Sequence, residues 1–323
     1  MKKILAVIFM VSFLGCQQKQ AGKIQKSEKN DWWLWTANWS PSSNQIATGG
    51  TQDTLRLFST INNRLQKNYQ FEGTITKAKW HPTKNKLAIS MQGGKSKSSI
   101  LNLETDERIV LDSINGFGAR AIGWNYTGEL LAVGDYDGFL IIFDERGKLM
   151  KKIATNQKGL MDLDWHPTKN LIVTVGEKVS LYNFENDVLN NIENRNEEVL
   201  MLCVEWHPTE DFFVTGDYGD YDKNYPPLLQ FWTSEGQRIK FIEKSKAEYR
   251  NLKWSKNGEL LATASERIRF WSKSGDLIAE KASENLLWGI DWSSEGDKIV
   301  TTDEKGSITI WNKSLNQSEE LKY

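Results

Sequence analysis

Three observations predict an all-β fold, a seven-bladed β-propeller of four-stranded antiparallel blades. The 323-residue chain contains 14 tryptophans, and seven of them precede a polar turn in a segment that recurs along the sequence. The recurrence has the period of about 40–45 residues that a four-stranded blade occupies. A chain of this length exceeds what one ordinary core fills, about 250–300 residues, unless the fold is modular. We therefore expect one repeated unit to organise residues 31–323.

The seven repeats align on the tryptophans that precede the turns, which we call the anchor tryptophans. Successive anchors are separated by 41, 44, 41, 41, 48 and 38 residues. The anchors are Trp39, Trp80, Trp124, Trp165, Trp206, Trp254 and Trp292. One anchor per repeat gives the count of seven blades and accounts for half of the tryptophans.

Each repeat divides into four short strands. An apolar segment leads into the anchor, and a turn such as Pro-Thr-Lys-Asn at 82–85 follows it. The second strand is rich in Val, Ile and Ala, as at 171–175, and the third ends in an aromatic residue, as at 267–271. A weaker, polar fourth strand follows, as at 276–282. Short runs bounded by turn formers are typical of strands, so we expect no helix beyond the N-terminal signal.

The last blade needs a fourth strand if the ring is to close without exposed edges. Residues 318–323 are predicted to supply it, because their offset from Trp311 matches that of 276–282 from Trp271. Residues 23–29 are the alternative source of this strand.

These features resemble the WD-repeat β-propeller family over about residues 31–323. The resemblance rests on the anchor-and-proline turn, the small-residue second strand and the aromatic residue that ends the third strand. No Trp-Asp dipeptide occurs in the chain, and no Gly-His dipeptide opens a repeat. The family's hydrogen-bond network of His, Asp, Ser and Trp is therefore not expected to be intact, and other propellers with similar turns remain an alternative.

The N-terminus has the features of an export signal. Lys2 and Lys3 precede an apolar run at 4–14, which is too short for the roughly 20 residues of a transmembrane helix. The run ends in Phe-Leu-Gly-Cys at 13–16 and resembles a bacterial lipoprotein signal, which implies lipidation, palmitate included, at Cys16. Residues 1–15 would be the signal peptide and 16–30 a flexible tether. Gln17 then points by resemblance to the outer membrane, and an ordinary secretory signal is the alternative.

Composition and motif spacing predict no catalytic centre. The formal net charge is −1, so the basic excess of a nucleic-acid binder is missing. The three histidines, His81, His166 and His207, occupy the same turn of different blades. They cannot converge on one metal ion, so we expect turn histidines, with no metal and no cofactor. Cys203 is predicted to be a buried small hydrophobe.

A long loop in blade five is a candidate for partner contact. The surplus of the longest repeat lies at 216–227 and carries Tyr218, Tyr221 and Tyr225. Tyrosine is enriched at protein interfaces. Asp220, Asp222 and Asn224 have the i, i+2, i+4 spacing of a calcium loop, but the glycine and the distal glutamate of the full loop are missing.

A second candidate is the mouth of the central channel. Residues five and two positions before the anchors are nearly all apolar, and a spacing of three fits a strand only if a bulge separates them. In propellers that this chain resembles, the residues between them lie near one mouth. The candidates are Trp35, Lys77, Arg120, Asp162, Arg250 and Trp288.

Trp35 and Trp288 come from the first and last blades, so a closed ring makes them neighbours. Tryptophan and arginine are the residue types enriched in binding hot spots. This cluster would therefore anchor a partner or, with Trp32 and Trp33, seal the seam between the two blades.

The sequence as a whole predicts a monomeric, non-enzymatic scaffold, tethered to a membrane of the bacterial envelope, that binds a protein or peptide. The alternative is an envelope propeller enzyme, a hydrolase or lyase, that uses mouth residues such as Arg120, Asp162 and Arg250. A purely structural subunit of an envelope complex is a third possibility.

Overall fold

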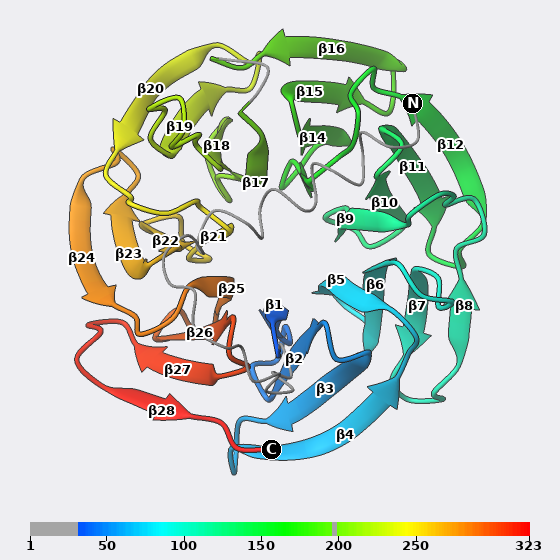
Figure 1. Cartoon of the computed structure of the whole chain (residues 1–323). Coiled ribbons are helices and arrows are strands. Elements are labelled where there is room, and N and C mark those ends of the chain that lie inside the picture. Colours follow the sequence, from blue (N-terminus) through cyan, green and yellow to red (C-terminus); the bar gives the residue numbers. More distant parts are fainter. Residues whose placement is uncertain (1–31, 196–198) are drawn as a thin grey trace, which may run out of the picture. The chain divides into compact units, whose positions relative to one another are not determined.

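The structure is a computed structural model that describes residues 32–195 and 199–323. These residues form seven four-stranded antiparallel sheets, arranged as blades around a common axis (Figure 1). The seven-bladed, all-β prediction is confirmed, and none of the described residues is helical. No helix in this part of the chain is therefore suited to crossing a membrane. The signal at 1–15, Cys16 and the tether at 16–30 lie outside the described residues and stay predictions.

Each blade is built from four consecutive strands, with the first strand innermost and the fourth at the rim (Figure 1). Blades one to three consist of β1 (Leu34–Trp39), β2 (Gln45–Gly50), β3 (Thr54–Ser59) and β4 (Arg64–Gln70); β5 (Thr74–Trp80), β6 (Lys86–Gln92), β7 (Ser99–Asn102) and β8 (Arg108–Val110); and β9 (Ala119–Trp124), β10 (Leu130–Asp135), β11 (Phe139–Asp144) and β12 (Leu149–Ala154). Blades four and five consist of β13 (Asp162–Trp165), β14 (Leu171–Val175), β15 (Lys178–Asn183) and β16 (Val188–Glu193); and β17 (Met201–Trp206), β18 (Phe212–Asp217), β19 (Leu228–Thr233) and β20 (Arg238–Glu243). Blades six and seven consist of β21 (Asn251–Trp254), β22 (Leu260–Ala264), β23 (Arg267–Ser272) and β24 (Leu277–Ala282); and β25 (Leu287–Trp292), β26 (Lys298–Asp303), β27 (Ile308–Asn312) and β28 (Ser318–Glu320).

A bulge interrupts the pairing of the first two strands where the sequence predicted it. In blade one, Leu34 pairs with Gly50 and Thr36 with Gly49, which leaves Trp35 as the extra residue. The same irregularity occurs in blades two, three, five and seven. In blades four and six the first strand begins only after this position. A bulge re-aims the side chain of the extra residue, so the strand's alternation is interrupted at this position in the other five blades.

The anchor tryptophans join neighbouring blades. Four of them donate the indole N–H to the backbone carbonyl of the residue that precedes the anchor in the previous blade, over 2.9–3.3 Å. At two further blade boundaries the anchor's backbone N–H donates to a carboxylate: that of Trp39 to Asp291 and that of Trp206 to Asp164, both over 2.8 Å. The recurrent tryptophan is therefore a recurrent link around the ring.

The three histidines cap turns, as predicted. Nδ1 of His81 accepts the backbone N–H of Thr83 and of Lys84, and its Nε2 donates to the carbonyl of Gly128 in the next blade over 3.0 Å. His207 repeats this arrangement, and His166 reaches Asp211 instead. Each ring packs edge-on against the next blade's anchor at 4.6–4.8 Å. Burial lowers the pKa of all three imidazoles, in keeping with this neutral, structural role.

The ring closes without an exchanged strand. β28 completes blade seven, which confirms the predicted C-terminal source of its fourth strand, and the alternative at 23–29 lies outside the described residues. Blades one and seven therefore each come entirely from their own end of the chain (Figure 1). Among the described residues, one isolated bridge, between Arg64 and Lys322, is the backbone pairing that joins these two blades.

Side chains hold most of this seam. Apolar residues of both blades form one buried cluster, which consists of Leu34, Ala37, Trp39, Ile46 and Phe58 from blade one and Val300, Ile308, Ile310 and Leu321 from the C-terminal side. The hydroxyl of Thr302 donates to the carbonyl of Leu34 over 2.9 Å, and the backbone N–H of Ser294 donates to the hydroxyl of Ser43 over 2.7 Å. The backbones also approach closely: a Cβ on Gly289 would lie 2.5 Å from the backbone nitrogen of Ala37.

Gly289→Ala should destabilise the protein because the added methyl meets backbone at the seam. We expect a loss of about 1–3 kcal/mol, the usual cost of overpacking, measured as a fall in the thermal midpoint. Gly123→Ala is the matched control, since its nearest new contact is the end of the Leu163 side chain at 3.2 Å. Equal shifts for the two variants would contradict a seam that depends on close backbone approach.

Candidate functional site

Seven equivalent positions meet at one end of the propeller axis. They lie four residues before each anchor and, together with Lys77 and Asn251, line a hollow of about 10 Å³, which we call the mouth. Its ring members are Trp35, Thr76, Arg120, Met161, Leu202, Arg250 and Trp288. Five of the six predicted mouth residues are thus brought together, and a space of this volume holds about one water-sized group.

Two of the predicted tryptophans lie directly on the seam. The ring of Trp288 packs against two tryptophans of blade one. Its centroid lies 4.9 Å from that of Trp35 and 5.4 Å from that of Trp33. Trp35 and Trp288 are only 9% and 5% exposed. Trp32 lies apart from them and packs edge-on against Tyr323 at 5.7 Å. Trp35 and Trp288 therefore seal the seam, one of the two roles predicted for this cluster, and they also line the mouth. The other role, to anchor a partner, stays a prediction.

Two arginines flank the tryptophan pair. The guanidinium carbon of Arg250 lies 4.0 Å from the ring centroid of Trp288, and that of Arg120 lies 5.4 Å from that of Trp35. Arg250 forms an ion pair with Glu248. Burial lowers the pKa of Arg250, and the neighbouring charge of Arg120 lowers it further. The mouth is therefore a desolvated aromatic and cationic site.

Asp162 has a structural position below the rim. Its carboxylate forms an ion pair with Lys77 and accepts the backbone N–H of Leu163 over 2.8 Å and of Val204 over 3.2 Å. Asp162 is 1% exposed, so it ties blades two, four and five together from the inside. This engagement leaves its oxygens little capacity for general acid or base chemistry at the mouth.

Sequence reasoning missed a second charged layer, deeper along the axis. Residues that directly precede the anchors contribute Lys79, Asp164, Glu205, Lys253 and Asp291. Glu205 and Lys253 form an ion pair. Burial raises the pKa of Asp291 to about 6, and burial together with the charge of Glu205 raises that of Asp164. The sequence could have predicted this layer, because residues one and three positions before the anchor share a face of the strand.

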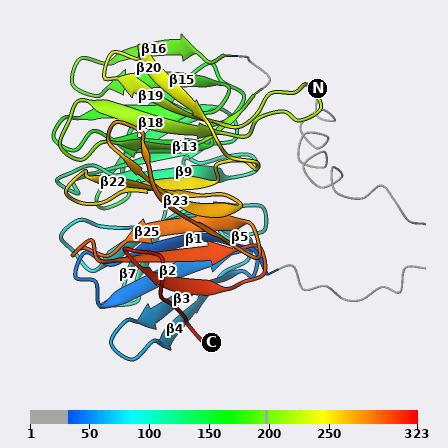
Figure 2. The same cartoon turned by 90° about the vertical axis from the view of Figure 1, so that its left-hand side faces the viewer.

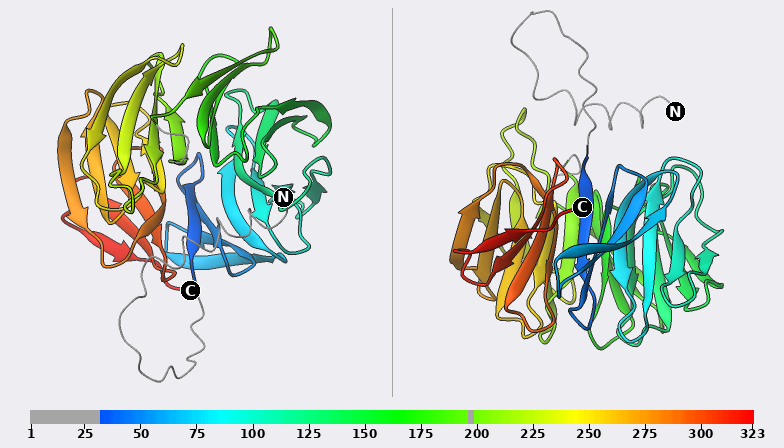
Figure 3. Two further views of the ribbon diagram at one scale, coloured as in Figure 1. Left: turned by 45° about the horizontal axis from the view of Figure 1, so that its top comes forward. Right: turned by 90° about the horizontal axis from the view of Figure 1, so that it is seen from below.

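The blade-five loop borders the mouth. β18 runs into this loop at the end where Asp217 pairs with Met201, the residue that begins β17 next to the mouth. The Tyr218 ring lies 5.8 Å from the guanidinium carbon of Arg250, and the Tyr221 hydroxyl donates to the carbonyl of Lys246. Edge-on views show the connecting loops gathered on two opposite faces of the ring (Figures 2 and 3). The two predicted contact regions thus belong to one face.

Tyr225 and Asp220 of the loop make local contacts. Tyr225 packs against Arg195 at 5.7 Å and pairs through its backbone with Asp220. The Asp220 carboxylate accepts the backbone N–H of Lys223 over 3.2 Å. Within the described ranges, no group of three or more His, Cys, Asp or Glu side chains is placed to hold a metal ion.

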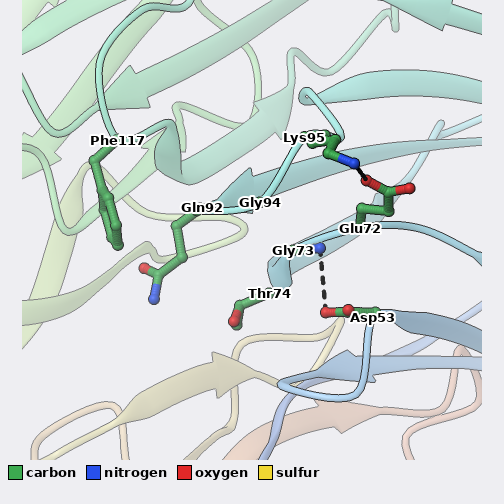
Figure 4. Close-up of a pocket in the computed structure, with 9 residues that line it drawn as sticks. Asp53, Glu72, Gly73, Thr74, Gln92, Gly94, Lys95 and Phe117 are labelled. Carbon is green, nitrogen blue, oxygen red and sulfur yellow. Dashed lines mark hydrogen bonds and ion pairs between the residues drawn. The ribbon is translucent and has the colours of Figure 1, made fainter.

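A larger groove, not anticipated from the sequence, opens on the same face beside the mouth. It has a volume of about 440 Å³ and is lined by Asp53, Glu72, Gly73, Thr74, Gln92, Gly93, Gly94, Lys95 and Phe117 (Figure 4). Thr74 pairs with Gln92 and lies two residues before Thr76 of the mouth, so β5 contributes to both hollows. The groove requires glycine at position 94, because a Cβ on Gly94 would lie 2.1 Å from the carbonyl oxygen of Glu72.

The walls of this groove differ in character. Phe117, 48% exposed, lies on one side with its ring edge-on to Tyr136 at 5.5 Å. The ion pair between Lys95 and Glu72, at 3.4 Å, lies on the other (Figure 4). The groove therefore has an aromatic wall and a charged wall.

Comparison with known proteins finds partial similarities. No family model matches the chain. A segment of 157 residues is 22% identical to the eukaryotic translation initiation factor 3 subunit I of Sclerotinia sclerotiorum and covers 45% of this chain and 47% of that protein. A segment of 190 residues is 23% identical to the intraflagellar transport protein 80 homolog of Mus musculus and covers 58% of this chain and 23% of that protein.

A third relative carries the repeat in its name. A segment of 111 residues is 28% identical to the F-box-like/WD repeat-containing protein TBL1Y of Homo sapiens and covers 30% of this chain and 21% of that protein. The chain spans less than half the length of each of these three relatives. Together with the seven-bladed ring, the similarities support a WD-repeat-like propeller.

Asp162→Ala should destabilise the protein by about 3–5 kcal/mol, because it leaves the buried ammonium of Lys77 without its counter-charge. Equilibrium denaturation would measure this loss. The double variant Lys77→Met, Asp162→Ala should lose less than Asp162→Ala alone, since no uncompensated cation remains. A double variant that loses the sum of both single effects would contradict a direct pair.

Proposed function

We propose that this protein is a non-enzymatic scaffold that binds a segment of another protein through the mouth face. The observation that carries the proposal is the mouth itself, where two tryptophans and two arginines from four different blades converge on one desolvated hollow. Residues of these types dominate the binding energy of protein interfaces. The groove and the tyrosine loop extend the same face on either side.

Rigid recognition follows from the architecture. Every blade packs against two neighbours, and each buried apolar cluster combines residues of adjacent blades. Preorganised surfaces of this kind change little in backbone on binding. The similarity to WD-repeat relatives, although low in identity, supports a scaffold in preference to the hydrolase or lyase alternative. Fold similarity by itself does not assign a function, so the site residues carry this argument.

The membrane tether is the second part of the proposal. It rests on the sequence at 13–16, which resembles a lipoprotein signal, and on the polar stretch at 16–30. Acylation of Cys16 would hold the propeller at a membrane of the bacterial envelope, because each buried methylene contributes about 0.8 kcal/mol. Gln17 favours the outer membrane.

Site-specific photocrosslinking tests the binding face. The photoreactive p-benzoylphenylalanine would replace Phe117 on the mouth face or Tyr126 on the opposite face; both residues are exposed aromatics of blade three. In cells that naturally produce the protein, we expect a discrete crosslinked partner from position 117 and none from position 126. The same adducts from both positions, or a partner from position 126 alone, would contradict binding at the mouth face.

Labelling with an alkyne analogue of palmitate tests the tether. Cys16→Ser should abolish incorporation of the label and release the protein from the membrane fraction, while Cys203→Ser, at a buried position, should leave both unchanged. A Cys16→Ser protein that still carries the label would overturn the lipoprotein assignment.

A further inference from the structure

The mouth has one positive charge without a counter-charge. Its charged groups are Lys77, Arg120 and Arg250 against Asp162 and Glu248. Lys77 is paired with Asp162, and Arg250 with Glu248. The side-chain contacts of Arg120 are the sulfur of Met161, at 3.7 Å, and the ring of Trp35. Among the described residues no carboxylate lies within ion-pair distance of Arg120.

Three hydrogen-bond donors of other residues that line the mouth also lack acceptors. The indole N–H groups of Trp35 and Trp288 and the Nε of Arg250 are buried without a partner. Native proteins satisfy the large majority of such buried donors, so each unsatisfied one calls for an explanation. A site with a surplus cation and several unpaired donors is complementary to an anionic group that only accepts hydrogen bonds. An ionised carboxylate has this chemistry.

The surroundings of the mouth indicate where the carboxylate comes from. The groove with Phe117 lies toward blades one to three, and the loop with Tyr218 lies toward blades five and six. A peptide that contacts both surfaces must cross the mouth, so the group that enters the hollow is a side chain from within the segment. The hollow, at about 10 Å³, has room for about one oxygen-sized group, so one oxygen of a carboxylate can enter it and the backbone of the segment cannot.

We propose that the mouth binds the carboxylate of an aspartate or glutamate side chain within an extended segment of the partner protein. Arg120 supplies the counter-charge, and the tryptophan pair supplies the N–H donors and the apolar wall. This inference rests on the proposed function, because it specifies what the scaffold's partner carries.

Selection from a random peptide library displayed on phage tests the inference. The displayed peptides are joined at their C-termini to the coat protein, so a carboxylate can come only from a side chain. We expect the peptides enriched on the immobilised propeller to share an acidic residue. Replacement of that residue by its amide, Glu→Gln or Asp→Asn, should weaken binding of the synthetic, amidated peptide by about tenfold or more, as for hydrogen bonds to charged groups.

A matched pair of variants links the effect to Arg120. Arg120→Gln should weaken binding of the acidic peptide to a similar extent, and the amide version of the peptide should then bind the variant no worse than the acidic one does. Arg146→Gln, an exposed change in the same blade, should leave binding unchanged. Thermal midpoints of both variants show that the fold is intact.

Several results would overturn the inference. If the acidic peptide and its amide version bind the mouth equally well, the carboxylate inference is wrong, but the scaffold proposal stands. If a neutral peptide with a free C-terminus binds Arg120 as tightly as the acidic peptide does, the mouth recognises a terminal carboxylate and not an acidic side chain. Failure to enrich any peptide that is sensitive to Arg120→Gln would also overturn it, and photocrosslinking at position 117 then judges the scaffold proposal separately.

Discussion

The closure of the ring depends on packing between the first and last blades. Many closed sheets avoid an open edge by continuous backbone pairing, but here each terminal blade is made from its own end of the chain. In place of an exchanged strand, the seam has the packing of Trp35 on Trp288, the apolar cluster around Leu34 and Ile308, and the close approach at Gly289. Two of the largest side chains of the protein therefore lie at the seam between the first and last blades.

The same tryptophan pair lines the mouth, so closure and the proposed recognition share residues. A seam between blades of distant sequence origin brings together side chains that no local segment could place side by side. In five of the seven blades a bulge before the anchor gives one side chain to the mouth, and in blades four and six the equivalent residue directly precedes the first strand. Below the rim, the ion pair of Lys77 and Asp162 links the inner strands, while Arg120 has no carboxylate within ion-pair distance among the described residues.

Much of the fold was predictable from the sequence because the anchor tryptophan, the turn and the bulge recur with one period. The position of the mouth residues followed from their spacing to the anchors. The contact between Trp35 and Trp288 followed from the same spacing, because the first and last blades are neighbours in a closed ring. The groove beside the mouth was not predictable, since it depends on how the loops at Gly93–Gly94 and Phe117 fall against each other. The sequence also did not reveal that Asp162 forms an ion pair with Lys77 while Arg120, among the described residues, has no carboxylate within ion-pair distance, because such pairs depend on which side chains meet across the axis. Cys16 and residues 16–30 lie outside the described part of the chain, so the tether stays a prediction.

Hydrogen exchange of the Trp288→Ala protein, followed segment by segment against the wild type, tests the seam most directly. If the tryptophan stack holds the ring closed, amides of β1 and β25 should lose protection while those of blades three to five keep theirs, because local opening exposes the elements that lose their packing first. Protection that falls evenly over all seven blades, or that does not change at the seam, would contradict this account.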